Sequence, residues 1–311
     1  MTGGAGFIGS HIVERLLEKD YDVTVIDNLN TGSPANVDRC RQKKNFHFVE
    51  GDILDPSLVR KNLKDVDVVF HEAGLASVAF SLKDPILTNH VNVDGTLNLL
   101  KASCDSNVKR FVFASSAAVY GNPGSPQKRE DDNPNPTSPY GVSKLAAEKY
   151  VLVFQRAYGL QTVCLRYFNV YGPRQRVDVH ASYGGVISIF INQILKNTPP
   201  TVHGDGEQTR DFVYIDDVVN ANMLAMDSEK GVGEVFNIAT GKSTSINRVA
   251  ETLKHLMNKD GLECVHTEQR PTDLKHGYAD ISRAKRTLGF RPQFSIEEGL
   301  AKLVNWYTKK N

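Results

Sequence analysis

The stretch Thr2-Gly3-Gly4-Ala5-Gly6-Phe7-Ile8-Gly9 decides the expected fold. Its glycines at positions 3, 6 and 9 allow a tight turn, the close approach of a pyrophosphate and the close packing of a following helix. Apolar residues then recur at helical spacing between positions 12 and 17, so a helix is expected directly after the loop. The N-terminus of such a helix attracts phosphates, because its backbone N–H groups and its dipole favour anions. The stretch therefore predicts a dinucleotide-binding turn.

Asp27 ends the short β-type run that follows, Val23-Thr24-Val25-Ile26. At this point of a dinucleotide-binding unit, a carboxylate accepts hydrogen bonds from the ribose hydroxyls and repels a 2′-phosphate. We therefore expect NAD rather than NADP. The alternative is that Asp27 only begins a turn at the end of a strand.

Only Met1 and Thr2 precede the glycine loop, although such a loop normally follows a central strand. A doubly wound sheet that lacks this strand would have unpaired strand edges in its middle. We therefore expect the start of the chain to be truncated or misassigned.

Further strands and helices alternate along the first half of the chain. Strands are expected at 46–49, 65–71 and 109–116, and a helix is expected at 89–104. This alternation predicts an α/β protein with a doubly wound (Rossmann) parallel sheet, whose chemistry gathers at the carboxyl edge of the strands. Glu72 follows one of these strands, near the expected pyrophosphate, and we interpret it as a solvent-facing or salt-bridged carboxylate.

Tyr140 and Lys144 lie in the stretch Pro139-Tyr140-Gly141-Val142-Ser143-Lys144, about one turn apart on one face of a helix. A lysine ammonium beside a phenol favours the phenolate, so we expect the pKa of Tyr140 to be lowered from about 10. Ser116 ends the strand at 109–116 and would meet Tyr140 at the same edge of the sheet. The alternatives are a surface Tyr/Lys pair and a serine that only ends a strand.

Bulk composition excludes several classes of protein. With 37 Lys+Arg against 36 Asp+Glu, the chain has no basic field for nucleic acid. The cysteines at positions 40, 104, 164 and 264 form no Cys-x-x-Cys pair, which predicts unpaired thiols in the cytoplasm and no zinc or other metal site. No apolar run approaches the length of a membrane span, and the start is not a signal peptide, so we expect no membrane partner.

Six motifs together resemble a known family. They are Thr-Gly-Gly-Ala-Gly-Phe-Ile-Gly at 2–9, Asp-Asn-Leu at 27–29, Ala-Ser-Ser-Ala-Ala-Val-Tyr-Gly at 114–121, Pro-Tyr-Gly-Val-Ser-Lys at 139–144, Arg-Tyr-Phe-Asn-Val-Tyr-Gly-Pro-Arg at 166–174 and Thr-Arg-Asp-Phe-Val-Tyr-Ile at 209–215. In this order they are specific, and they cover nearly the whole chain. The chain resembles an extended short-chain dehydrogenase/reductase of the UDP-glucose/UDP-N-acetylglucosamine 4-epimerase type.

The resemblance implies two lobes. Residues 1–169 with 211–240 would form an NAD-binding Rossmann domain, and residues 170–210 and 241–311 would form a smaller α/β lobe that binds the UDP-sugar. It further implies a homodimer through the helices near 89–104 and 140–157. NAD would be held permanently, because it is regenerated in each cycle.

The resemblance also implies a mechanism. Tyr140, as phenolate, would take the proton from the 4-hydroxyl of the sugar, while Lys144 would lower its pKa and bind the nicotinamide ribose. The C4 hydride would pass to NAD, and the 4-keto sugar would turn and receive the hydride on its other face. Ser116 would hydrogen-bond O4 throughout. The cofactor-binding positions implied are Gly3, Gly6, Phe7, Ile8, Asp27, Asn28, Asn30, Thr31, Gly32, Asp52, Ile53, Ala73, Gly74, Asn92, Ser115, Tyr140, Lys144 and Tyr167.

The implied substrate-binding positions are Ser116, Phe168, Asn169, His203, Arg210, Arg270, Asp273 and Gly277. Arginine suits the UDP diphosphate because its fork donates parallel hydrogen bonds, although Arg210 and Arg270 would otherwise read as surface salt-bridge partners. His203 falls where a planar side chain packs on uracil, and a structural histidine is the alternative.

Two positions bear on the reaction and on the sugar. Ala117 and Ala118 stand where the related dehydratases carry an Asp-Glu pair and the decarboxylases a Glu, so epimerisation is favoured. Gly277 matches a gatekeeper whose small size admits a C2 N-acetyl group, so we expect UDP-GlcNAc/UDP-GalNAc as well as UDP-Glc/UDP-Gal. Alternatively, Gly277 only serves a backbone turn. A UDP-glucuronate 4-epimerase and a catalytically silent NAD-binding regulatory module are the other functions considered.

Overall fold

The computed structural model describes residues 1–121, 125–176, 185–269 and 275–310. A parallel β-sheet organises the larger part of the molecule, as the alternation of elements predicts. Its strands are β1 (Val23–Asp27), β2 (Phe46–Glu50), β3 (Val68–His71), β4 (Arg110–Ser116), β6 (Gln161–Tyr167) and β11 (Glu234–Ile238). β1 pairs with β2, and the other four strands run in the order β11-β6-β4-β3, with every pairing parallel.

The segment Met1 to Gly3 lies between β1 and β3, where the first strand is expected. Thr2 bridges Ile26 on one side and His71 on the other. The backbone N–H of Thr2 donates to Phe70, and that of Gly3 donates to Ile26, each at 3.0 Å. These residues therefore connect the two halves of the sheet at the level of the glycine loop.

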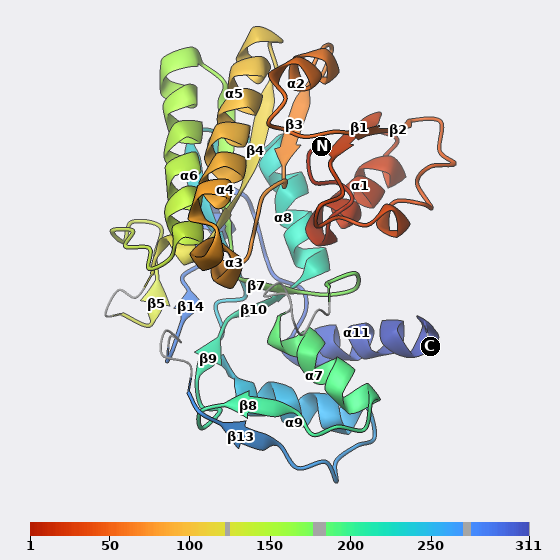
Figure 1. Cartoon of the computed structure of the whole chain (residues 1–311). Coiled ribbons are helices and arrows are strands. Elements are labelled where there is room, and N and C mark those ends of the chain that lie inside the picture. The colour runs from red at the N-terminus through yellow and green to blue at the C-terminus, as the bar shows by residue number, and fades with distance from the viewer. Residues whose placement is uncertain (122–124, 177–184, 270–274, 311) are drawn as a thin grey trace.

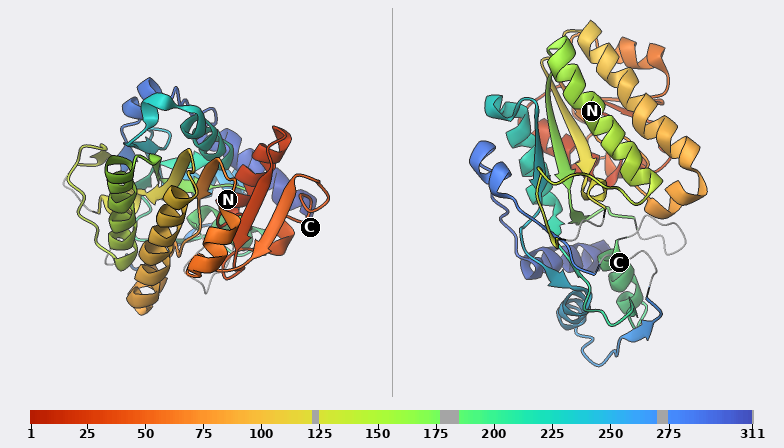
Figure 2. Two further views of the ribbon diagram at one scale, coloured as in Figure 1. Left: turned by 90° about the horizontal axis from the view of Figure 1, so that it is seen from above. Right: turned by 90° about the vertical axis from the view of Figure 1, so that its left-hand side faces the viewer.

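Helices cover both faces of the sheet. α1 (Phe7–Glu18) and α8 (Ile215–Asp227) pack together on one face, and α2 (Pro56–Asn62), α5 (Gly95–Asp105) and α6 (Pro139–Tyr158) pack on the other. Figure 1 shows α5 and α6 to the left of the sheet and α8 to its right, and Figure 2 shows the same layers from two further sides. The prediction of a doubly wound α/β fold is confirmed.

The helix expected at 89–104 begins earlier than its apolar pattern indicates. It consists of α4 (Pro85–Asn89), a π-helical segment (His90–Asp94) and α5, and it follows the short α3 (Val78–Lys83). The side chain of Asp84 accepts the N–H of Leu87, and a proline occupies the first position of α4, both of which favour a helix start here.

A second lobe lies at the carboxyl edge of the sheet, in the lower half of Figure 1. It contains the helices α7 (Val186–Leu195), α9 (Ile246–Leu256) and α11 (Ile296–Lys310). Short strands accompany them: β8 (Thr201–His203) pairs with β13 (Val265–Thr267), and β9 (Thr209–Arg210) pairs with β12 (Thr244–Ser245). α10 (Ser282–Thr287) instead packs against β11 of the large sheet.

Two small strand pairs lie where the lobes meet. β7 (Asn169–Tyr171) runs parallel to β10 (Phe212–Tyr214), and β5 (Gln127–Lys128) runs parallel to β14 (Tyr278–Ala279). One continuous apolar core extends from Ile12 of α1 to Leu300 of α11. Because this core is shared, the two lobes pack as one unit, and the predicted boundaries between them remain a prediction.

Candidate active site

The glycine loop has the close contacts that its sequence predicts. Gly3 has φ +68°, and a Cβ on it would lie 2.6 Å from the backbone nitrogen of Ala73. A Cβ on Gly9 would lie 2.1 Å from the carbonyl oxygen of Gly3. Gly6 is the N-cap of α1 and provides no side-chain hydrogen bond to the first turn. The N–H groups at this helix start are therefore left for a ligand, and an anion suits them.

Asp27 lies at the carboxyl end of β1 and is 7% exposed. Its Oδ2 accepts the N–H of Ala5 at 2.8 Å, and its Oδ1 accepts the N–H of Leu29 at 2.9 Å. Burial raises the pKa of Asp27, while these two backbone hydrogen bonds lower it. The carboxylate is thus held rigidly at the edge of the cleft, with lone pairs left for ribose hydroxyls.

Most of the predicted cofactor residues line one continuous cleft along the carboxyl edge of the sheet. One end is lined by Gly3, Gly6, Asp27, Asn28, Asn30, Thr31, Asp52, Ile53, Ala73 and Gly74. The other end is lined by Phe7, Ile8, Ser115, Ser116, Tyr140, Lys144, Tyr167 and Phe168, and it shares Gly3, Gly6, Thr31 and Gly74 with the first. The structure therefore brings the predicted dinucleotide site and the predicted catalytic residues together.

Gly32 and Asn92 are predicted cofactor residues that do not line this cleft. A Cβ on Gly32 would lie 2.8 Å from Oδ1 of Asp27, so this glycine packs behind that carboxylate. Asn92 is 2% exposed, and its amide bonds the N–H of Leu75 at 2.8 Å and the hydroxyl of Ser143 at 2.9 Å. Asn92 therefore holds Leu75, a lining residue of the cleft, through hydrogen bonds without lining the cleft itself.

Ser116 and Tyr140 meet at the point where β4 ends and α6 begins. Ser138 caps α6 by accepting the N–H of Gly141 at 3.1 Å, and Pro139 follows at the first helical position. This start places Tyr140 in the first turn of the helix, where the nearby Ser116 hydroxyl lowers the pKa of its phenol. The Ser116 Oγ also accepts the N–H of Ala118 at 3.1 Å, which fixes the rotamer of the serine.

The prediction that Lys144 lowers the pKa of Tyr140 is wrong. Burial raises the pKa of Tyr140, the nearby Ser116 hydroxyl lowers it, and the negative charge of Glu72 raises it further. Lys144 is 7% exposed, and its Nζ lies 4.8 Å from the centre of the Phe113 ring. Burial lowers the pKa of Lys144 to about 8, against the opposing effect of Glu72.

Glu72 is the site residue that sequence reasoning missed. It lines both ends of the cleft, and its Oε1 accepts the hydroxyl of Tyr167 at 2.6 Å. Asn222 on α8 in turn donates to the Tyr167 oxygen at 2.8 Å. Burial raises the pKa of Glu72 to about 7, although Tyr167 and Lys144 both lower it. The interpretation of Glu72 as a solvent-facing or salt-bridged carboxylate misses this hydrogen bond with Tyr167; the residue is half-buried in the wall of the cleft, and its position after β3 was the available signal.

The predicted substrate residues are only partly gathered by the structure. Phe168 lines the cleft beside Tyr140. Asn169 donates to the backbone oxygen of Asp211 at 3.0 Å, and Arg210 donates to that of Thr209 at 2.7 Å. His203 bonds Thr267 at 2.9 Å within the second lobe. These three residues, Asn169, Arg210 and His203, do not line the cleft, and Arg270 and Asp273 lie outside the described residues.

Gly277 precedes β14 and is half-buried. Among the described residues, no heavy atom lies within 4 Å of a Cβ built on it. Its φ is not among the positive values of the chain, so its backbone conformation does not demand glycine. The alternative in which Gly277 only serves a turn therefore finds no support in the backbone.

Two kinds of feature, a metal-binding cluster and a membrane-spanning helix, are absent from the described parts of the chain. Within the ranges given above, no group of three or more His, Cys, Asp or Glu side chains is arranged to hold a metal ion. In the same ranges, no helix combines the length and the apolar character that a membrane crossing requires.

A dinucleotide cleft that runs into a Ser–Tyr–Lys group at the carboxyl edge of a parallel sheet defines an enzyme of the short-chain dehydrogenase/reductase class. The profile of the NAD dependent epimerase/dehydratase family matches residues 1–239, and the chain belongs to this family. The family name confirms the predicted NAD cofactor. The residues fit NAD, because Asp27 presents a carboxylate in the cleft and the start of α1 carries no side-chain cap.

The relatives that this chain resembles carry related names. A putative UDP-glucose 4-epimerase of Methanocaldococcus jannaschii is 43% identical over 313 residues, covering 100% of this chain and 98% of the relative. The crystal structure of a Thermotoga maritima UDP-glucose 4-epimerase with UDP-glucose has a TM-score of 0.93 and 41% identity, covering 99% and 98% of the chains. A UDP-N-acetylglucosamine 4-epimerase of Methanobrevibacter ruminantium M1, solved with UDP-N-acetylmuramic acid, has a TM-score of 0.93 and 42% identity, covering 100% and 97%. The prediction of an epimerase enzyme is confirmed by these relatives.

Proposed function

We propose that the protein is an NAD-dependent 4-epimerase of UDP-hexoses. The observation that carries this proposal is the placement of Ser116, Tyr140 and Lys144 together at one end of a cleft that also contains the glycine loop and Asp27. An acid/base group, a hydrogen-bond partner for a reacting oxygen and a dinucleotide site thus share one cavity. That combination fits the removal and return of a hydride at a carbon that bears a hydroxyl group.

The residues of the chain have separate tasks in this reaction. Bound NAD supplies a reversible hydride acceptor. Tyr140 takes the proton of the sugar 4-hydroxyl and later returns it, and Ser116 donates a hydrogen bond to O4 as negative charge develops there. Lys144 lies on the same face of α6 and would hold the nicotinamide ribose of bound NAD. The 4-keto sugar must turn between the two hydride transfers, so the site must hold its UDP group more firmly than its ring.

The segment after β4 favours epimerisation over the other reactions of related enzymes. It is a short 3₁₀ turn, Ala117–Val119, and it begins with two alanines. Elimination of water or loss of carbon dioxide would need an acidic or basic side chain here, and alanine provides neither. Epimerisation needs no acid/base group beyond Tyr140.

The sugar and the UDP contacts rest on the residues of the second lobe. We assign the diphosphate and ribose to Asn169, Arg210, Arg270 and Asp273, and the uracil to His203. The open space at Gly277 supports room for an N-acetyl group, so UDP-GlcNAc and UDP-GalNAc are proposed as substrates beside UDP-Glc and UDP-Gal. The names of the relatives, which include both glucose and N-acetylglucosamine enzymes, agree with this breadth.

We also propose a homodimer that acts in the cytoplasm. An apolar face runs over three neighbouring helices, α3, α4 and α6, which pack against one another. Its members are Leu82, Ile86, Val142 and Val153, with 63%, 81%, 52% and 51% of each residue exposed. Apolar surface of this extent on adjacent helices is suited to burial against a second copy of the chain.

The hydride mechanism is tested by running the reaction in heavy water. UDP-galactose incubated with the purified protein should give UDP-glucose with no deuterium at C4, because the hydride leaves to the cofactor and returns from it. Conversion with deuterium at C4 would show exchange with solvent and would exclude the proposed mechanism. NMR of the product measures both outcomes.

A further inference from the structure

Glu148 and Arg166 form an ion pair that is enclosed behind the catalytic strand. Their side chains are 0% and 3% exposed. Nε and Nη2 of Arg166 donate to the two carboxylate oxygens of Glu148 at 2.9 and 2.7 Å, so both arms of the guanidinium fork are used. Burial lowers the pKa of Arg166, but the ion pair with Glu148 outweighs it and the net pKa is raised. The pair is therefore a charged, bidentate contact in the core.

This pair connects α6, which carries Tyr140 and Lys144, with β6, whose Arg166 lies opposite Ser115 of the neighbouring β4. Glu148 lies on α6 about two turns after Tyr140, with Lys144 between them on the same helix face. The hydroxyl of Ser115 donates to Oε2 of Glu148 at 2.7 Å. Since Ser115 immediately precedes Ser116, the carboxylate of Glu148 fixes α6 to the end of β4. The predicted cofactor role of Ser115 would thus fall to its backbone, because its hydroxyl is committed to Glu148.

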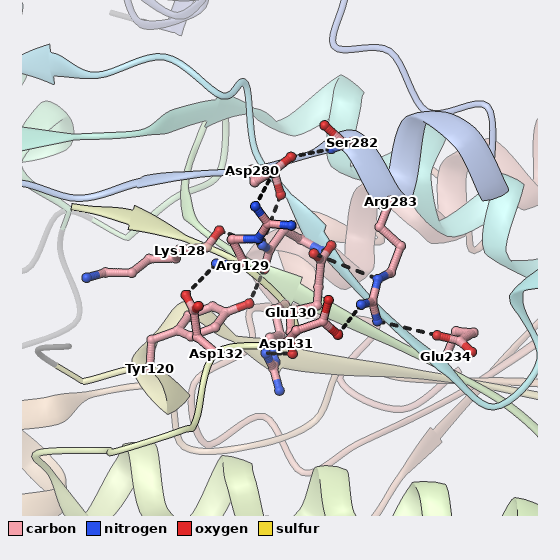
Figure 3. Close-up of polar contacts among 12 residues, drawn as sticks. Tyr120, Lys128, Arg129, Glu130, Asp131, Asp132, Glu234, Asp280, Ser282 and Arg283 are labelled. Carbon is pink, nitrogen blue, oxygen red and sulfur yellow. Dashed lines mark hydrogen bonds and ion pairs between the residues drawn. The ribbon is translucent and has the colours of Figure 1, made fainter. Parts of the chain in front are cut away.

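Arg166 extends the network toward the second lobe. Its guanidinium lies over the ring of Tyr120, 4.7 Å from the ring centre. The Tyr120 hydroxyl donates to Oδ1 of Asn237 at 2.6 Å, and Nδ2 of Asn237 donates to the backbone oxygens of Lys128 and Asp280, each at 3.1 Å. Figure 3 shows Tyr120, Lys128 and Asp280 in this arrangement. The polar chain therefore ends on the strand pair β5–β14, beside Gly277.

The far end of this chain is held by ion pairs. Arg283 on α10 lies 3.9 Å from Glu130 and 3.4 Å from Glu234, as Figure 3 shows. Glu130 also accepts the backbone N–H of Asn237 at 2.9 Å. The network is thus anchored at both ends, on the catalytic helix α6 and on α10 beside β11.

We propose that Glu148 and Arg166 are positioning residues that set the placement of Tyr140 beside Ser116; the proposal rests on the function proposed above. A buried ion pair contributes little net stability compared with apolar side chains of similar volume, because both charges must be desolvated. The bidentate fork instead fixes the distance and the angle between α6 and β6, and Ser115 opposite Arg166 on the neighbouring β4 binds the same carboxylate. Acid/base groups work only when they are held within about 0.5 Å of the productive geometry.

The test replaces the pair by apolar residues of similar volume, Glu148→Leu with Arg166→Met. This double variant should unfold cooperatively at a melting temperature close to that of the wild type. Its kcat should fall about 100-fold while the KM for the UDP-hexose changes little, because a shift of about 1 Å in the reacting groups has this effect on rate. The rising limb of the kcat–pH profile should move to higher pH, because Tyr140 moves away from the Ser116 hydroxyl that lowers its pKa. A folded double variant with kcat within threefold of the wild type and an unshifted profile would overturn the proposal.

Two further variants keep the test decisive. If the double variant does not fold, Ser115→Ala replaces it, because this substitution removes only the hydroxyl that contacts Glu148. Ser115→Ala should lower kcat several-fold and move the rising limb of the kcat–pH profile to higher pH. An unchanged kcat and an unchanged profile would overturn the proposal. The matched control is Arg110→Met with Glu229→Leu, at the opposite end of β4. The arginine of this pair is also buried, with 5% of its side chain exposed. This control should leave kcat and the pH profile unchanged.

A readout that does not need activity separates this proposal from the proposed function. The Cζ resonance of Tyr140 in ¹³C-tyrosine-labelled protein, assigned with Tyr140→Phe, reports the titration of the phenol directly. It should titrate at higher pH in the double variant than in the wild type. If the wild type converts no UDP-hexose, the proposed function fails, and this titration still decides whether the pair positions Tyr140. Identical titration in both proteins would overturn the positioning role.

Discussion

The carboxylate of Glu72 accepts a hydrogen bond from the hydroxyl of Tyr167 at 2.6 Å, within the cleft that contains the glycine loop. A Cβ on Gly3 would lie 2.8 Å from the backbone carbonyl carbon of Glu72, so the backbone of Glu72 packs directly against the loop, and both residues line the cleft. An acidic side chain in that position opposes the anionic pyrophosphate of a dinucleotide unless it is protonated. Its pKa therefore bears on cofactor binding.

Binding of NAD should weaken as the pH rises through about 7, because burial raises the pKa of Glu72 to about 7. Below this pH the carboxyl is neutral, and above it the charge repels the pyrophosphate. In Glu72→Gln the affinity should stay flat over the same range. Calorimetric titration of NAD into cofactor-stripped protein between pH 6 and 8.5 measures both. Glu50→Gln, at the exposed end of β2, is the control and should keep the wild-type pH dependence.

The same shift predicts a change in stability. Because the folded-state pKa of Glu72 is raised from 4.5 to about 7, its contribution to stability is present below the lower value and lost as the pH rises through the higher one. As the pH rises between these two values, the melting temperature of cofactor-stripped Glu72→Gln should therefore increase relative to that of the cofactor-stripped wild type. A difference that does not depend on pH would contradict the enclosed position of this carboxyl.

Replacing Tyr140 by phenylalanine should reduce kcat about 10²- to 10⁴-fold, the usual size of an acid/base contribution. NAD content should stay at the wild-type level, because Asp27 and the glycine loop remain. Tyr150→Phe is the matched control: this residue lies on the same helix, 42% exposed, and its substitution should leave kcat unchanged. Loss of bound NAD in Tyr140→Phe would show that the tyrosine acts through the cofactor site instead.

Gly277→Tyr should strongly reduce turnover of N-acetylated substrates and spare UDP-galactose. The new ring would enter the open space beside Gly277 and exclude a C2 substituent. We expect about a 10- to 200-fold loss in kcat/KM for UDP-GalNAc, typical of a steric change in a pocket. Gly261→Tyr serves as the control, because the same substitution there also meets nothing within 4 Å among the described residues. Equal losses for both sugars would remove Gly277 from substrate selection.

Lysines on the apolar face of α4 and α6 should separate the proposed dimer. Ile86 and Val153 are 81% and 51% exposed, so Ile86→Lys with Val153→Lys costs the isolated chain little. Sedimentation velocity should show a monomer, in contrast to a wild-type dimer. Leu195→Lys, on α7 and 40% exposed, should remain dimeric. A double variant that sediments like the wild type would place the interface elsewhere.

Short-range sequence patterns predict much of the fold and part of the site. The spacing of the glycines, the β-type run before Asp27 and the alternation of strands and helices predict the parallel sheet and its cleft. The separation of Tyr140 and Lys144 by about one helical turn is enough to place them on one face of α6. These features depend on neighbours in sequence, and the structure reproduces them.

Features that depend on distant contacts were not predictable from the pattern. The pKa of Tyr140 is set by burial and by Glu72, and neither is visible in the stretch that contains the tyrosine. The carboxylate of Glu72 accepts a hydrogen bond from Tyr167, which lies far along the chain. The helix that carries Asn92 contains a π-helical segment, and an apolar period of 3.6 residues does not signal one.

The central claim is tested most directly by incubating purified, cofactor-loaded protein with UDP-galactose, UDP-GalNAc and UDP-glucuronate in parallel, without added NAD, and measuring the products by NMR. The account predicts UDP-glucose from the first and UDP-GlcNAc from the second, in amounts that approach equilibrium and with no net reduction of cofactor. Turnover of UDP-glucuronate alone, or no conversion of any of the three, would contradict it.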